Sequence, residues 1–143
     1  MELEGAKRCY KNLKDDGVKI DTFVSDRHIG IAKWLREKEP STNHLFDIWH
    51  VCKSITKKMI AASKETGMEI LKKWVKGVKN HLYWSVTSTK PGFTEMISAK
   101  WQSLMYHICD KHKEFPGSLF TECTHGELEK RDWIEIGEEY SVY

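Results

Sequence analysis

The chain has 143 residues, of which 40% are hydrophobic and 31% charged, and its formal net charge is +2. This length and composition predict one folded domain with a hydrophobic core and exclude an intrinsically disordered chain. No apolar run approaches the roughly 20 residues of a membrane-spanning helix, so we expect no membrane partner. The cysteines are scattered and the N-terminus lacks a signal-peptide pattern, so we expect an intracellular, reducing compartment.

The first third of the chain predicts a helix followed by a strand, a second helix and a second strand. Apolar residues recur at helical spacing over residues 2–16, and a β-type run follows over residues 20–25. Residues 27–39 fit a helix that ends before Pro40, because the residue preceding a proline disfavours helical backbone. Residues 44–48 supply the second strand. Two strands joined by such a helix form a right-handed crossover, so we expect them to pair in parallel.

After residue 50 the apolar spacing is helical almost throughout. One apolar face recurs over residues 51–62, a stronger one over residues 70–82, and the clearest one over residues 96–108. A further short helix is expected around residues 128–134. This pattern predicts a mainly helical second half.

The whole sequence therefore predicts a mixed α/β fold dominated by helix. We expect a single partial domain over residues 1–143. Residues 1–50 would form its strand-helix-strand core with one preceding helix, and residues 51–143 a mainly helical insertion.

Each of the two predicted strands ends near an aspartate, Asp26 in the first case and Asp47 in the second. The ends of parallel strands lie at one edge of a sheet, so these two carboxylates are expected near each other. Carboxylate oxygens are the ligands that Mg²⁺ prefers, which makes this edge a candidate metal site. The alternative is that both aspartates form turns or cap helices, as they often do at such positions.

The middle of the chain is locally basic, because residues 50–90 contain nine lysines and two glutamates. Two predicted helices there form a candidate surface for the phosphate backbone of DNA, which such surfaces attract without reading sequence. The alternative is an ordinary solvated face opposite an apolar stripe. The lysines that we single out are Lys53, Lys57, Lys58, Lys72, Lys73, Lys76 and Lys79.

Cysteines and histidines gather between residues 107 and 125. Cys109 and His112 lie one helical turn apart and would share a face, and Cys123 and His125 could close a site from a loop or strand. Zn²⁺ prefers four such ligands in a tetrahedral set, so these four residues are a candidate zinc site. Their spacing is not that of a standard zinc finger, and separate side chains in a core or at the surface are the alternative.

Two stretches, Val24–His28 (VSDRH) and Phe46–His50 (FDIWH), resemble a known family. They resemble the catalytic region of eukaryotic cut-and-paste DNA transposases, closest to Kolobok-type elements. The resemblance implies a ribonuclease H-like fold and a DDE triad of carboxylates that holds two Mg²⁺ or Mn²⁺ ions. It makes Asp26 the second aspartate of that triad, and it places Asp47 and His50 in a supporting D-x-x-H motif.

The sequence departs from this family at the other two members of the triad, for which it contains no match. We therefore expect an internal fragment of a transposase-like, DNA-processing domain, without catalysis of its own. A domesticated module that binds DNA or protein through the basic helices is the alternative. A small metal-dependent enzyme built on Asp26, Asp47 and His50 is a third hypothesis.

The expected partners follow from the basic helices and from this resemblance. They are double-stranded DNA, bound weakly and without sequence preference, and a partner chain or flanking segments that complete the sheet. We expect the protein in the nucleus.

Overall fold

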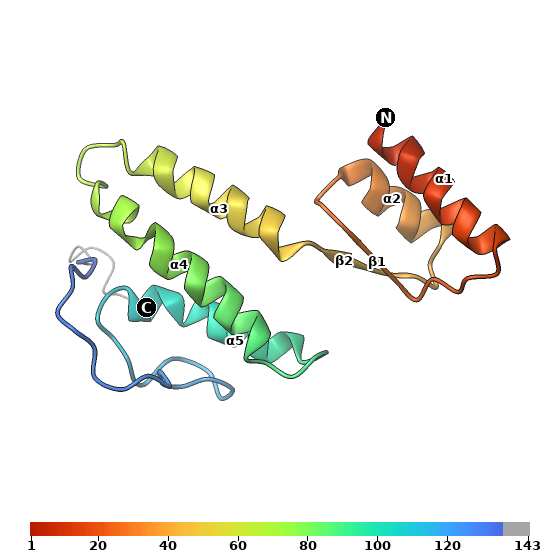
Figure 1. Ribbon diagram of the computed structural model, residues 1–143. Coiled ribbons are helices and arrows are strands. Elements are labelled where there is room, and N and C mark those ends of the chain that lie inside the picture. Colours follow the sequence, from red (N-terminus) through yellow and green to blue (C-terminus); the bar gives the residue numbers. More distant parts are fainter. Residues whose placement is uncertain (136–143) are drawn as a thin grey trace. The chain divides into compact units, whose positions relative to one another are not determined.

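The computed structural model describes residues 1–135, and Figure 1 shows its helices and strands in chain order. The elements are α1 (Glu2–Asp15), β1 (Thr22–Ser25), α2 (Ile29–Lys38), β2 (Asn43–Phe46), α3 (Ile48–Ala62), α4 (Ile70–Thr87), α5 (Thr94–Gln102) and α6 (Leu104–His107). The fold is mixed α/β and helix-dominated, as the sequence predicted. The chain divides into two compact units, Met1–Ser54 and a second that starts at Ile55, and each has its own hydrophobic core.

In the first unit, β1 and β2 pair in parallel and are joined through α2. Thr22 lies opposite Asn43, and Ser25 lies opposite Phe46. A hairpin turn cannot connect a parallel pair, so the crossover helix that separates the two strands in the sequence is required. The predicted strand-helix-strand unit is therefore confirmed.

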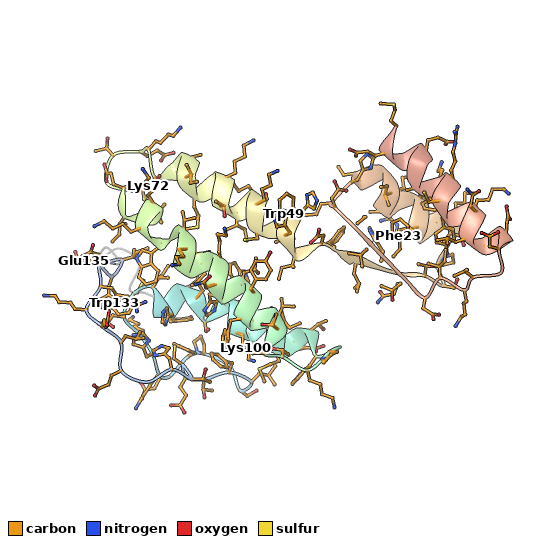
Figure 2. The ribbon with its side chains drawn as sticks, viewed as in Figure 1. Phe23, Trp49, Lys72, Lys100, Trp133 and Glu135 are labelled. Atoms are coloured by element: carbon orange, nitrogen blue, oxygen red, sulfur yellow. The ribbon has the colours of Figure 1, made fainter. Side chains whose placement is uncertain are left out.

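The core of the first unit packs α1 and α2 against β1. Leu35 is 1% exposed and, with Ile31 one turn earlier, forms the buried face of α2. The ring of Tyr10 on α1 lies edge-on to Trp34, 5.3 Å between centroids. Phe23, labelled in Figure 2, packs against the same cluster. The helices α1 and α2 thus pack together against β1.

The core of the second unit lies between α3, α4 and α6. Trp74, Val78 and Leu104 are buried, and Ile55 and Met59 of α3 pack against them. Figure 1 shows α3 and α4 side by side, with α5 beside α4. The helix α4 therefore supplies the central apolar stripe of this unit.

Two predictions for the second unit need correction. The apolar pattern over residues 96–108 forms two pieces, α5 and α6, and residues 128–134 form no helix. The last stretch is held by tertiary hydrogen bonds: Trp74 Nε1 donates to the Asp132 carbonyl (2.9 Å), and the Ile134 N–H donates to the Ile108 carbonyl (2.8 Å). No helix within residues 1–135 is long and apolar enough to cross a bilayer.

Candidate functional site

Asp26 and Asp47 each follow the last residue of their strand, so both stand at the same end of the parallel pair. Each carboxylate accepts a hydrogen bond from a backbone N–H two residues later in the chain. Asp26 Oδ1 accepts the His28 N–H (3.2 Å), and Asp47 Oδ1 accepts the Trp49 N–H (2.8 Å). His28 in turn caps α2, because its Nδ1 accepts the Ile31 N–H (3.3 Å). Both aspartates thus form turns that lead into helices.

His50 lies exposed in the first turn of α3, and its ring packs edge-on against Trp49, 4.8 Å between centroids. Trp49 is itself 51% exposed, and Lys53 Nζ lies 4.8 Å from the centroid of its ring. The start of α3 therefore presents an aromatic side chain and a cation together at the surface.

All seven lysines named above are exposed. On α4, Lys72, Lys76 and Lys79 follow at spacings of four and three residues, on the side of the helix away from the buried Trp74. We call these three residues the α4 basic face. Figure 2 shows Lys72 near the connection between α3 and α4.

Lys73 is engaged differently, because its Nζ lies 2.6 Å from Asp132 Oδ2. The hydrogen bond and the charge of Lys73 lower the pKa of the Asp132 carboxyl. Lys57 and Lys58 are exposed on α3. Of the α4 lysines, Lys73 therefore has an intramolecular counter-ion.

Three histidines and one cysteine converge just beyond α6. They are His107, His112, Cys123 and His125, and the ligand atoms of all four lie within 4.8 Å of one another. His107 Nδ1 is 3.5 Å from Cys123 Sγ and 3.3 Å from His125 Nε2. We call these four residues the His₃Cys cluster. Among residues 1–135, this is the set of three or more His, Cys, Asp or Glu side chains whose ligand atoms lie close enough together to hold a metal ion.

The backbone after α6 brings these side chains together. His107 ends α6, and the chain reverses at Asp110, whose left-handed backbone (φ 59°) is rare outside glycine but tolerated by aspartate. His112 then returns beside His107. The Cys123 N–H donates to the His112 carbonyl (2.8 Å), which aligns the later stretch with this turn.

Hydrogen bonds outside the cluster orient two of its rings. His112 Nε2 lies 3.0 Å from Asp110 Oδ1, while His112 Nδ1 is buried and has no hydrogen-bond partner. His125 Nδ1 lies 2.8 Å from the Gly126 carbonyl, so that its Nε2 is the atom near His107. Metal-bound histidines commonly use their second nitrogen in this way.

The environment of His107 favours its neutral imidazole. Burial lowers the pKa of His107 to about 4, and the positive charges that His112 and His125 can carry add to this effect. Burial also raises the pKa of the Cys123 thiol. At neutral pH His107 therefore keeps its lone pair, whereas the thiol keeps its proton until a cation displaces it.

Of the four predicted zinc ligands, the structure brings together His112, Cys123 and His125, but not Cys109. The prediction required the helix to continue from Cys109 to His112, whereas α6 ends at His107 and the chain turns at Asp110. His107 takes the fourth position. The sequence shows His107 five residues before His112, but whether its side chain reaches the cluster depends on where α6 ends.

The comparison with known families adds the decisive observation. The family model for Mutator-like transposases matches residues 1–125, which include Asp26 and the complete His₃Cys cluster. The chain belongs to the Mutator-like transposase family. No curated protein and no solved structure gives a match. The predicted relationship to transposases is confirmed at this level, and the Kolobok-type assignment stays a prediction.

Membership in this transposase family implies a relationship to DNA processing, which requires DNA binding and, in the intact enzymes, divalent metal ions. Within residues 1–135 the aspartates at the sheet end do not fit such ions. Asp26 and Asp47 are not part of any group of three ligands, and one oxygen of each accepts a backbone N–H. Two-metal chemistry needs carboxylates that bridge both ions, so we derive no catalytic step from these two residues.

Proposed function

We propose that this Mutator-like transposase chain binds duplex DNA through the α4 basic face and does not cleave it on its own. The observation that carries the proposal is the row of three exposed lysines on one side of α4, away from its buried stripe. Between Lys72 and Lys79 the helix rises about 10 Å, a length over which B-DNA presents several phosphates. Lys57 and Lys58 of α3 extend the positive charge of the same unit.

The chemistry of this surface predicts how it binds. Lysine ammonium groups neutralise phosphates as point charges and carry no base-reading geometry, so binding is independent of sequence and sensitive to salt. The dissociation constant is expected to be on the order of 10⁻⁴ to 10⁻⁶ M at physiological salt. Trp49, exposed beside Lys53, would add stacking to any single-stranded region.

Replacing Lys72, Lys76 and Lys79 together by glutamine is expected to weaken binding to an arbitrary duplex. The slope of log affinity against log salt should become shallower by about 1 for each lysine that contacts a phosphate. Fluorescence anisotropy of a labelled duplex, titrated at several salt concentrations, measures both effects. The matched control replaces the exposed Lys33, Lys38 and Lys90, which removes the same charge elsewhere.

The outcomes of this comparison separate the proposal from a general charge effect. Equal losses in both triple variants would mean that net charge alone drives binding. No binding by the unmodified chain even at low salt would rule out DNA binding, and the lysines would then form a solvated face. A loss confined to the α4 variant supports the proposal.

A second candidate function, metal-dependent cleavage by Asp26, rests on the place of Asp26 beside Asp47 at the sheet end. We expect no nicking of supercoiled DNA with Mg²⁺ or Mn²⁺. Asp26→Asn keeps the oxygen that accepts the His28 N–H, so this variant tests charge without removing the turn. Nicking that disappears in Asp26→Asn and persists in Asp21→Asn, at the other end of β1, would contradict our proposal.

A further inference from the structure

DNA binding by α4 leaves the His₃Cys cluster without a role. We propose that the cluster binds one Zn²⁺ through His107 Nδ1, His112 Nδ1, Cys123 Sγ and His125 Nε2. The ion would be structural, because four protein ligands leave no open coordination position for a substrate. It would fasten the irregular segment that follows α6 to the end of that helix. This inference is independent of the proposed DNA binding.

The distances suit a zinc ion. Bonds of about 2.0–2.1 Å to nitrogen and 2.3 Å to sulfur place tetrahedral ligand atoms roughly 3.3–3.6 Å apart. Cys123 Sγ and His125 Nε2 already lie 3.5 Å and 3.3 Å from His107 Nδ1. The remaining pairs lie within 4.8 Å, so rotations of side chains suffice to close the set.

Hydrogen bonding alone does not account for the cluster. A bond from His107 Nδ1–H to His125 Nε2 would explain that one pair, but His112 Nδ1 would still be buried without a partner. A buried polar atom without a hydrogen-bond partner destabilises the folded state. Coordination to a metal satisfies this atom, and Asp110 then accepts the proton on the outer Nε2 of the same ring.

The donor types select the metal. Three imidazoles and one thiolate suit Zn²⁺, whereas Mg²⁺ and Ca²⁺ require oxygen ligands. Trp133 packs edge-on against the rings of His107 and His112, at 5.9 Å and 5.3 Å between centroids. Figure 2 shows Trp133 on the C-terminal segment, near α4. This aromatic contact shields one side of the cluster from water and favours a closed, structural site.

The test compares two cysteines of similar burial, of which one belongs to the cluster. The full chain is purified without a histidine tag and dialysed, and its zinc is measured by mass spectrometry, with one ion per chain expected. Co²⁺ is then substituted for zinc. Tetrahedral Co²⁺ bound to a thiolate gives visible bands and a sulfur-to-cobalt charge-transfer band. Cys123→Ser should abolish the charge-transfer band, and Cys109→Ser should keep it.

Circular dichroism shows whether each variant is folded. Should Cys123→Ser fail to fold, His125→Asn replaces the most exposed ligand and is expected to lower zinc affinity at least tenfold. Substoichiometric zinc in the folded, unmodified chain after incubation with the ion would overturn the proposal. So would a charge-transfer band lost in Cys109→Ser and kept in Cys123→Ser, which would assign the thiolate to the other cysteine.

Discussion

Replacing Leu35 by alanine is expected to lower the free energy of unfolding of the first unit by about 2–5 kcal/mol. Leu35 is the most deeply buried apolar side chain of this unit, with 1% of its surface exposed. It lies in one cluster with Tyr10 and Ile31, so its removal leaves a cavity between α1 and α2. The unit has about fifty residues and a small core, and a loss of this size would unfold much of it.

Hydrogen exchange of the α1 and α2 amides measures this effect separately from the second unit. Val24→Ala is the control within the same unit. Val24 is 60% exposed, so its truncation should change the free energy of unfolding by no more than about 0.5 kcal/mol. Similar effects of both substitutions would mean that α2 does not pack as described. Faster exchange in α4 of the Leu35 variant would show that the two units unfold together.

The parts of the fold that the sequence predicted are those set by local patterns. The parallel pair follows from two short β-type runs separated by one helix, because a helical connection of this length suits the right-handed crossover between parallel strands. The buried stripe of α4 follows from apolar spacing. Asp26 and Asp47 were expected at one end of the sheet, and the register places them there. These features depend on residues that are near in sequence.

The parts that were not predicted depend on contacts between distant residues. His107, and not Cys109, joins the cluster because the chain reverses at Asp110. Asp110 has a positive φ although it is not a glycine, and no turn motif in the sequence predicts this reversal. The helix expected at residues 128–134 is replaced by an irregular segment, because Trp74 and Ile108 supply its hydrogen-bond partners. Apolar spacing cannot distinguish a helix from a segment that inserts single side chains into a groove.

The segment from residue 108 to residue 135 is the part of the second unit with the least regular secondary structure. It contains no helix or strand, so its order depends on contacts with α4 and α6. Fixing each backbone residue costs about 1–2 kcal/mol in conformational entropy. Its contacts with the helices include the Trp74–Asp132 and Ile134–Ile108 hydrogen bonds and the packing of Trp133 on Trp74, 5.6 Å between centroids. The rings of Phe115 and Phe120 also pack against Tyr106 and Trp84, at 5.4 Å and 5.7 Å between centroids. A metal ion that joins four points of this segment and α6 would offset much of the remaining cost.

Removal of zinc from the His₃Cys cluster should therefore destabilise the second unit strongly. A ligand present at 1,000 times its dissociation constant stabilises the folded state by about 4 kcal/mol, and a strong chelator removes this contribution. Amides from His112 to Trp133 should lose protection first, because they depend on the ion directly. Hydrogen exchange with and without chelator, followed by limited proteolysis, measures the loss.

The first unit serves as an internal control for this experiment, because the cluster belongs to the second unit. Exchange in α1 and α2 should be unchanged by the chelator, and Cys109→Ser should respond as the unmodified chain does. The Cys123→Ser chain should already show the exchange pattern of the chelated protein and should not change further. Equal protection of residues 112–133 with and without zinc would mean that hydrogen bonds and the packing of Trp133, Phe115 and Phe120 hold the segment without the ion. The ion would then have no structural role, even where it binds.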